Sequence, residues 1–511
     1  MASMVSADSV VPQQLQACLT AIADALTSGV VQAAPAITWT ARGPPSAGPR
    51  VPSAIKIAKR VGVELNRDRA LIAAALGVIL MTGSALPAHA DTGATVTIDF
   101  NAAGMPTPAT SIGTSITGYG QGDYITNSQN HRARMAALAP RTLRMELAYA
   151  TPGDPASHLQ CGGDHCATDQ SADDWVSAMV GLGAAPTIVL PLDGRHAAQL
   201  DVTDAVNIYK HFAATATPVT RFIVGNELDN SYNPKHMAAT EYSSRFNQIN
   251  DALKAINSNI TIGGPALASY NTGYLDTFLA NSGQRADFID IHDYGQGGDT
   301  NYSDADLLGK VVRGYGTTLA DMRARIDAAV PGRAIGMQIG EFNLSWSGDP
   351  RTLTHFNTVW GAAVLGTILG KGAVALQYGD KNGQLGLTSE NGEGGFARNQ
   401  PLPIYHGIGM FTGEGLFRSF GASMIPTKSD TATLYAFAST NQRNIVLVNT
   451  ATTTQPTTVN YQGLSAGSAV EWQSTDTNAN APQNIGTITI DGTGPISLTL
   501  PPMSVTTILI G

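Results

Sequence analysis

Two glutamates, each placed just after a short apolar run, are the residues of this sequence best suited to chemistry. Glu227 follows Phe222-Ile223-Val224 after a Gly-Asn pair, and Glu341 follows the run 335–340. Unbroken apolar runs of this kind are typical of buried parallel strands. A carboxylate at the carboxyl end of such a strand lies where α/β barrels carry their active sites. Two of them predict a glycosidase pair, one an acid/base and one a nucleophile.

Three polar side chains are expected close to this pair. Asn226 precedes the first glutamate, and its amide could hold a sugar hydroxyl beside the reacting centre. Tyr294 ends the expected strand 288–294, which lies next to that of Glu341, so its hydroxyl could donate to Glu341. His292 is either part of the site or a core histidine, and the sequence leaves both open. Each glutamate alone could equally cap a helix or pair with an arginine.

The elements that position these residues alternate between strands and helices eight times over about 300 residues. Such an alternation is typical of a (β/α)₈ barrel. We therefore expect the α/β class, with a TIM barrel over residues 109–412 that carries Glu227 after its fourth strand and Glu341 after its seventh. The expected strands are residues 111–116, 141–145, 186–192, 222–224, 260–265, 288–294, 335–341 and 373–378.

A second domain follows the barrel. From about residue 415 the apolar pattern has a period of two, in short runs between turns, with no helical pattern among them. This pattern predicts a C-terminal β-sandwich over residues 413–511. The alternating run 95–100 precedes the barrel and has nowhere else to pair. Residues 91–108 are therefore expected to join the sandwich and to complete one of its edges.

The first 90 residues are expected to be a leader. A basic flank, the apolar run 70–81 and the ending Pro87-Ala88-His89-Ala90 indicate a signal peptide over about residues 67–90, with cleavage after Ala90. A membrane anchor is the alternative, but this run is short for a span of about 20 residues. With such a signal peptide, we expect the mature protein to be secreted or periplasmic. Residues 1–60 show no periodicity, and a start codon assigned too early would explain them.

Charge and cysteines narrow the possible partners. The 421 residues after Ala90 carry 23 Lys and Arg against 35 Asp and Glu, which disfavours nucleic acid and anionic lipid. We expect no nucleic-acid partner and no stable membrane insertion. Cys161 and Cys166 form an even pair in an exported chain and predict a small loop disulfide. A metal site through His165 is the alternative, although it lacks a fourth ligand. No nucleotide-binding loop or zinc-protease motif follows Ala90, so we infer no cofactor.

With these motifs, residues 92–511 resemble the retaining (β/α)₈ glycosidases. Within that clan, the sequence is similar to glycoside hydrolase family 79, the heparanase and β-glucuronidase family. The resemblance rests on Asn226-Glu227, Glu341, His292-Asp293-Tyr294, Pro401-Leu402-Pro403-Ile404-Tyr405 and the domain layout. It implies a retaining hydrolase of β-linked glucuronic acid, in glycosides or in heparan-sulfate-like glycans. It also implies that Glu227 is the acid/base, Glu341 the nucleophile and Tyr294 the partner of the nucleophile.

The resemblance extends to substrate binding. The family holds the uronic-acid carboxylate with backbone amides and a tyrosine after strands seven and eight, where this chain has Gly348, Tyr378, Gln384 and Gly386. After strand one, mammalian members of the family carry an aspartate that contacts the sugar, whereas this chain offers Ser115, Thr117 and Tyr119. The alternatives are a retaining enzyme of the same clan for neutral sugars (arabinofuranoside, xyloside or glucoside) and a carbohydrate-binding protein without catalysis.

Overall fold

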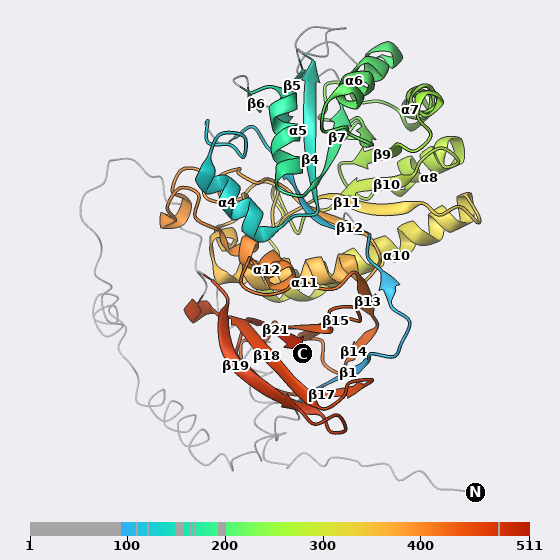
Figure 1. Ribbon diagram of the computed structural model, residues 1–511. Coiled ribbons are helices and arrows are strands. Elements are labelled where there is room, and N and C mark those ends of the chain that lie inside the picture. Colours follow the sequence, from blue (N-terminus) through green and yellow to red (C-terminus); the bar gives the residue numbers. More distant parts are fainter. Residues whose placement is uncertain are drawn as a thin grey trace, which may run out of the picture. The chain divides into compact units, whose positions relative to one another are not determined.

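The computed structural model describes residues 93–108, 111–119, 122–149, 158–162, 165–167, 170–192, 201–478 and 481–511. The predicted leader and its cleavage site after Ala90 lie outside these residues. The described residues form an α/β barrel and a β-sandwich, and the sandwich takes strands from both before and after the barrel (Figure 1). None of the helices in the described ranges is long and apolar enough to span a membrane.

Eight parallel strands form a closed barrel, as the sequence predicts. Neighbouring strands are hydrogen-bonded around the ring, and the pairing of the first with the second closes it. In chain order they are β3 (Ile112–Ile116), β4 (Thr142–Tyr149), β7 (Ala185–Leu190), β8 (Arg221–Val224), β9 (Thr261–Leu267), β10 (Phe288–His292), β11 (Gly336–Phe342) and β12 (Val374–Gln377). Glu227 therefore follows the fourth strand and Glu341 ends the seventh.

Helices surround the barrel because their apolar faces cover the outward side chains of its strands (Figure 1). They are α4 (Gln129–Leu138), α5 (Ala172–Gly181), α6 (Val202–Ala214), α7 (Ala239–Ile256), α8 (Thr272–Ser282), α9 (Asp304–Asp306), α10 (Val312–Ala329), α11 (His355–Leu369) and α12 (Pro403–Thr412), with short π- and 3₁₀-turns between some of them. Trp175, Trp360 and Tyr315 are among the largest fully buried side chains of this layer. The stretch 401–405, which contributes to the family resemblance, begins α12, where Tyr405 donates to the carbonyl of Arg134.

The barrel interior is more polar than its outer layer. Val189, Ile223, Ala266 and Phe288 form a separate small apolar cluster. The remaining inward positions include fully buried polar side chains, among them Thr114, Arg144, Thr187, Asp290, Gln338 and Gln377. Some of them bond to one another across the barrel, as between Thr114 and Gln377 (2.8 Å). A polar interior of this kind supplies charged groups directly beneath the mouth of the barrel.

The sandwich has a four-stranded and a seven-stranded sheet. The first has the order β14, β1, β17, β20, and the second has the order β19, β18, β21, β16, β15, β13, β2. Their bounds are β1 (Ala94–Asp99), β2 (Met105–Pro106), β13 (Ser423–Ile425), β14 (Thr427–Ser429), β15 (Leu434–Ser439), β16 (Asn444–Asn449), β17 (Gln455–Gln462), β18 (Gly467–Ser474), β19 (Gln483–Ile490), β20 (Ile496–Leu500) and β21 (Ser504–Ile510).

The expected position of the first strand was wrong in one respect. β1 does not complete an edge, because it pairs with β14 on one side and with β17 on the other. Its alternating residues Val96 and Ile98 are buried in the sandwich core. β1 has an inner position in its sheet because the short strand β14 pairs with its other side. The period-two pattern of the sequence does not reveal β14.

The cysteine pair lies in a small extension of the barrel sheet. β5 (His158–Gly162) pairs antiparallel with β4, and β6 (His165–Ala167) pairs antiparallel with β5. In this register Cys161 lies opposite Cys166. The side chains of these residues lie outside the described part of the structure, so the disulfide stays a prediction.

Candidate active site

Glu227 is presented by a tight turn at the end of β8. Gly225 has φ +74°, and Glu227 itself adopts the left-handed conformation, with φ +52°. A side chain at Gly225 would place its Cβ 2.8 Å from Cδ1 of Leu228, so the turn requires glycine there. The backbone N–H of Glu227 donates to the carbonyl of Ala266 (2.8 Å), which holds the turn against β9. A left-handed glutamate is strained, and such strain is concentrated at functional sites.

Glu341 is presented by an irregularity in β11. The pairing of β10 with β11 joins Ile291 to Ile339 but His292 to Glu341, so one residue of β11 is bulged. The bulge turns Glu341 into the barrel mouth. One ligand atom each of Glu227, His292 and Glu341 lie within 4.8 Å of one another. This spacing of the two carboxylates fits a retaining glycosidase, whose carboxyl groups are about 5–5.5 Å apart.

Two donors hold the Glu341 carboxylate at both oxygens. Tyr294 donates its hydroxyl to Oε2 (2.6 Å), as the sequence predicts. Nη1 of Arg144, an arginine of β4 with only 1 % of its side chain exposed, donates to Oε1 (2.9 Å). The same guanidinium donates to Oδ1 of Asn226, so Arg144 joins the two strand ends. Burial lowers the pKa of Arg144, but the negative charges of Glu341, Glu146 and Asp290 together outweigh this and raise it above its ordinary value.

Arg144 is the functional residue that the sequence reasoning missed. It lies in the predicted second strand, between Leu143 and Met145, and a single polar residue in a buried strand does not by itself indicate a role in the site. A signal was present, because a charge in an apolar strand needs a partner inside the protein. The partner is 197 residues further along the chain, and no local pattern identifies it.

His292 is a fully buried histidine that also contacts both candidate catalytic glutamates. Its fully buried ring places Nδ1 2.7 Å from Oε1 of Glu227 and 3.5 Å from Oε2 of Glu341. Burial lowers the pKa of His292, but the charge of Glu341 and the hydrogen bond to Glu227 raise it to about 9. At neutral pH an imidazolium therefore lies between the two carboxylates.

Glu227, His292 and Glu341 are also suited by type and spacing to hold a divalent metal ion. Two features disfavour a cation at this place. The imidazole would first have to lose a proton, and the guanidinium of Arg144 lies 2.9 Å from Glu341. The arrangement is better suited to moving a proton between a buried imidazole and a carboxylate.

The other predicted site residues lie in loops after β3, β11 and β12. The rings of Tyr378 and Tyr294 meet edge to face, with centroids 6.2 Å apart. Burial raises the pKa of Tyr378, and the nearby charge of Glu341 and, to a smaller extent, that of Tyr119 add to the effect. Gly348, with φ +92°, lies against the side chain of Gln384, where a Cβ would meet Nε2 at 2.2 Å.

Gly386 is less open to a ligand than the sequence suggests. Its N–H donates to the carbonyl of Gly383 (3.3 Å), so this amide is already bonded within its loop. A Cβ at Gly386 would lie 2.9 Å from two backbone atoms of the same loop, which explains the glycine. The loop itself is fixed to β11, because Nδ2 of Asn343 donates to the carbonyl of Leu385 (2.7 Å).

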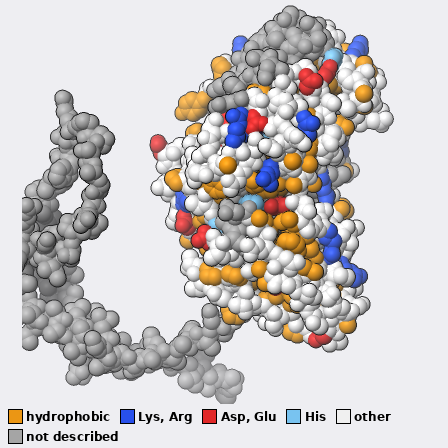
Figure 2. Space-filling model, turned by 60° about the vertical axis from the view of Figure 1, so that its left-hand side comes forward, with side chains coloured by type: hydrophobic (Ala, Val, Ile, Leu, Met, Phe, Trp, Pro, Cys, Tyr) orange, Lys and Arg blue, Asp and Glu red, His pale blue; other side chains and the backbone are white. Residues whose placement is uncertain are grey.

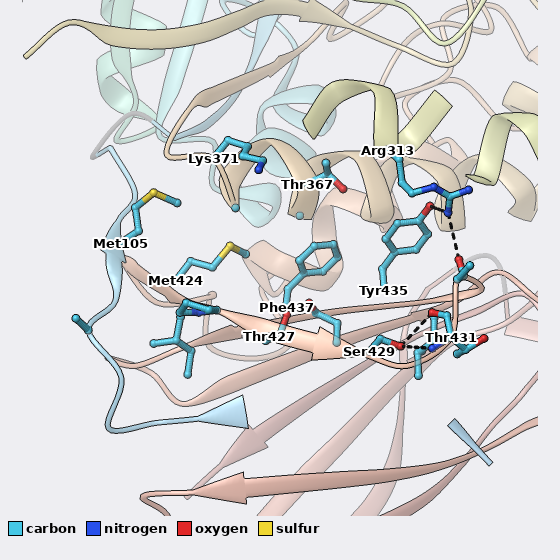
Figure 3. Close-up of a pocket in the computed structure, with 18 residues that line it drawn as sticks. Met105, Arg313, Thr367, Lys371, Met424, Thr427, Ser429, Thr431, Tyr435 and Phe437 are labelled. Atoms are coloured by element: carbon cyan, nitrogen blue, oxygen red, sulfur yellow. Dashed lines mark hydrogen bonds between the residues drawn. The ribbon is translucent and has the colours of Figure 1, made fainter. Parts of the chain in front are cut away.

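A cavity of about 550 Å³ lies elsewhere, between α10, α11 and the strands β13 to β15 of the sandwich (Figure 3). Met105, Met424 and Phe437 line it, with Arg313 and Lys371 on its helical side. None of the site residues described above belongs to this cavity. On the face shown in Figure 2, Lys and Arg side chains are scattered among acidic and uncharged ones and form no continuous basic surface.

Fold and site together define a (β/α)₈ barrel with a C-terminal β-sandwich and a paired-carboxylate site at the barrel mouth. No family model matches the sequence, and no curated protein matches it. Solved structures do match over most of the chain.

One of these structures is the family 51 arabinofuranosidase of Xanthomonas axonopodis pv. citri, with TM-score 0.65, 14% identity, and coverage of 82% of this chain and 100% of that chain. A xyloglucanase of glycoside hydrolase family 44 from Paenibacillus polymyxa has TM-score 0.61 and 14% identity, and covers 82% and 99%. The α-L-arabinofuranosidase of Thermotoga maritima has TM-score 0.63 and 15% identity, and covers 81% and 99%. At such identities the likeness confirms the fold. None of the three is assigned to family 79.

The Arg144 ion pair gives a test of the site geometry. In Arg144→Met we expect the free energy of unfolding to fall by about 3–5 kcal/mol, because the change leaves Glu341 buried without its charged partner. Chemical denaturation measures this loss. The matched control is Arg245→Met, which removes an exposed pair with Glu241 (3.2 Å) and should cost less than about 1 kcal/mol. Equal losses in the two variants would contradict the proposed burial of the Arg144 pair.

The His292 imidazolium predicts a pH dependence. Since its pKa is raised from 6.5 to about 9, its contribution to stability is complete below about pH 6.5 and is lost as the pH rises through about 9. The difference in unfolding free energy between the wild type and His292→Gln should shrink over that window, by on the order of 3 kcal/mol. Asp293, whose pKa burial raises to about 7, titrates in both proteins and cancels from the difference. A difference that stays constant from pH 6 to 10 would rule out the imidazolium.

Proposed function

We propose that this protein is a retaining glycoside hydrolase, with Glu227 as acid/base and Glu341 as nucleophile. The observation that carries the proposal is the placement of the two carboxylates within 4.8 Å of each other, at the ends of the fourth and seventh barrel strands. Likeness in fold to glycoside hydrolases of families 44 and 51 supports it.

The reaction has two displacements. Glu341 attacks the anomeric carbon and forms a glycosyl-enzyme ester, while Glu227 gives its proton to the departing glycosidic oxygen. Glu227 then takes a proton from water, whose oxygen attacks the same carbon and releases Glu341 as a carboxylate. Each displacement inverts the anomeric centre, so the product retains the configuration of the substrate.

The neighbours of the two carboxylates suit these different roles. Glu341 has 6 % of its side chain exposed and accepts from Arg144 and Tyr294, which fixes the orientation of the attacking carboxylate. Glu227 is more open, with 23 % exposed, as a group that must reach water requires. Because Nδ1 of His292 lies 2.7 Å from Oε1 of Glu227, a proton can be shared between them before it is donated.

For the sugar, we propose β-linked glucuronic acid, on the sequence resemblance to family 79. Tyr378, together with Gly348 and Gln384, which lie against each other, would bind its carboxylate from the loops after β11 and β12. Neutral glycosides are the second candidate. The fold neighbours, a xyloglucanase and an arabinofuranosidase, favour them. So does the ion pair of the buried Lys381 with Asp123 (2.9 Å), because a lysine paired in this way is not free to bind a uronic-acid carboxylate.

We also propose that the substrate extends over several sugars. Trp346, five residues after Glu341, is 58 % exposed, and its ring lies against the backbone of Gly297 and Gly298. Tyr232, five residues after Glu227, is 93 % exposed. Exposed aromatic faces beside a catalytic mouth suit the stacking of sugar rings. An aromatic ring offers a large apolar face on a stiff side chain, so little conformational freedom is lost when a sugar binds.

The test is the release of nitrophenol from aryl β-glucuronide, β-glucoside, β-xyloside and α-arabinofuranoside by the purified protein, with the anomer of the product followed by NMR. Turnover of one of them with retention would support the proposal, and the sugar released would choose between the two candidates. Inversion would exclude the mechanism. No turnover of any of the four aryl glycosides, or of oligosaccharides, would favour a carbohydrate-binding protein.

Substrate length has its own prediction. In Trp346→Ala we expect kcat/KM to fall about tenfold, equivalent to about 1.4 kcal/mol, on an oligosaccharide, and to change little on the aryl glycoside of the same sugar. Leu416→Ala is the matched control, because Leu416 is similarly exposed (47 %) but lies just before the sandwich. Equal losses on the long and the short substrate would show that Trp346 supports the loop rather than the sugar.

A further inference from the structure

Asp290 is a buried acid that the proposed mechanism does not use. It lies on β10, two residues before His292, and its side chain is fully buried. Within the described part of the chain, neither of its carboxylate oxygens has a hydrogen-bond partner at bonding distance and angle, although the amide of Gln338 lies close enough to lower its pKa. Burial of a polar group without a partner is costly, so such a group calls for a physical explanation.

The bulge of β11 lies directly beside this acid. Asp290 is paired with Gln338 and His292 with Glu341, so Gly340 is the extra residue of the bulge. Side chains alternate along a strand, so positions 338 and 340 face the barrel interior and 341 would face away. The extra residue returns Glu341 to the interior, where the site needs it.

The carboxyl group of Asp290 fills the space that a side chain at Gly340 would occupy. A Cβ at Gly340 would lie 2.3 Å from Oδ1 and 2.7 Å from Oδ2 of Asp290. Real side chains do not approach so closely, so either the acid or the bulge would have to move. Asp290 and Gly340 are therefore matched in size, and the matched pair immediately precedes Glu341.

Charged and titratable groups face Asp290 from several elements. They are Arg144 on β4, Arg221 on β8, Tyr242 on α7, His292 on β10 and Glu341 on β11. Burial raises the pKa of Asp290, and the positive charges of His292 and Arg144 oppose this only in part. The raised pKa favours the neutral acid, and asparagine has nearly the same shape.

We propose that Asp290 is a positioning residue, which packs as an acid against Gly340 and so sets the direction in which Glu341 leaves its strand. Its effect on turnover rests on the proposed function, whereas its packing against Gly340 does not. Asp290 does not touch the substrate, so its loss should lower kcat and leave KM nearly unchanged. A misplacement of the nucleophile by about 1 Å is enough to cost on the order of 100-fold in rate.

The experiment compares Asp290→Asn, Asp290→Ser, Gly340→Ala and the double variant Gly340→Ala/Asp290→Ser in the full chain. We expect Asp290→Asn to keep kcat within about threefold, because asparagine fills the same space, and the two other single variants to lose at least about tenfold. In the double variant the shorter serine makes room for the new methyl group, so kcat should exceed that of Gly340→Ala. Gly336→Ala is the control, since its nearest contact would be at 3.2 Å.

The pH dependence of stability tests whether Asp290 is buried as the neutral acid. Because burial raises the pKa of Asp290, the native wild type loses stability as the pH rises above about 3.8, so the stability of Asp290→Asn relative to the wild type should increase as the pH rises from there. A wild-type kcat in Asp290→Ser, or a stability difference independent of pH, would overturn the proposal.

The double variant also allows the packing to be tested if the protein proves not to be a glycosidase. If the wild type hydrolyses no glycoside, the proposed function fails, and the pair is then read from the unfolding free energies of the same four variants. Effects of Gly340→Ala and Asp290→Ser that are not additive would support the packing. Additive effects would overturn it.

Discussion

Glu341→Gln is expected to abolish turnover while the protein stays folded. Without the nucleophile no glycosyl-enzyme forms, and losses on the order of 10⁴- to 10⁶-fold in kcat are typical when a hydrolase loses its nucleophile. The amide keeps the size of the carboxylate and can still contact Tyr294 and Arg144, so the barrel mouth should be preserved. Rates on an aryl glycoside, with circular dichroism of the same samples, provide the measurement.

Glu241→Gln is the matched control for this variant. It makes the same chemical change at an exposed glutamate of α7, 54 % of whose side chain is accessible, and it should keep the wild-type rate. If Glu341→Gln retained more than about one hundredth of the wild-type kcat while folded, the nucleophile would have to be another group.

Glu227→Gln is expected to divide substrates by their leaving groups. An alkyl or sugar leaving group needs a proton as it departs, and the loss of general acid catalysis should cost about 10²- to 10⁴-fold. A dinitrophenyl leaving group departs without help, so formation of the glycosyl-enzyme should hardly change. Deglycosylation then becomes slow, because no base activates water, and a burst of dinitrophenol should precede the steady state.

Added azide distinguishes this role from a structural one. As an anion it needs no base, so it should restore turnover of the dinitrophenyl glycoside by Glu227→Gln and yield a glycosyl azide of retained configuration. Losses of the same size on both kinds of substrate, without a burst and without rescue, would remove Glu227 from the acid/base role.

The barrel and its two glutamates could be predicted from the sequence because their signals are local. A buried strand such as Phe222-Ile223-Val224 shows itself by composition, and the glycine after it marks the end of the strand. The order of the strands then follows from the barrel itself, which places Tyr294 beside Glu341.

Arg144 and Asp290 could not be assigned in this way. Both are single charges within apolar strands, and their meaning depends on partners more than 45 residues away, which a periodic pattern does not contain. The substrate loops are a similar case. That the N–H of Gly386 is bonded to Gly383 follows from loop geometry, which no motif specifies.

The position of β1 has a consequence for the order of folding. β1 is made before the barrel, yet its partners Ser429 and Val459 are made more than 300 residues later. During synthesis from the ribosome the sandwich thus stays incomplete until the whole barrel has emerged. The closure entropy of so long a segment rises only slowly with length, by about 0.6 kcal/mol per doubling, but a folded barrel shortens the effective separation. We therefore expect the barrel to fold first and to bring β1 and β2 to the strands that follow it, so that the sandwich is assembled last from segments on both sides of the barrel.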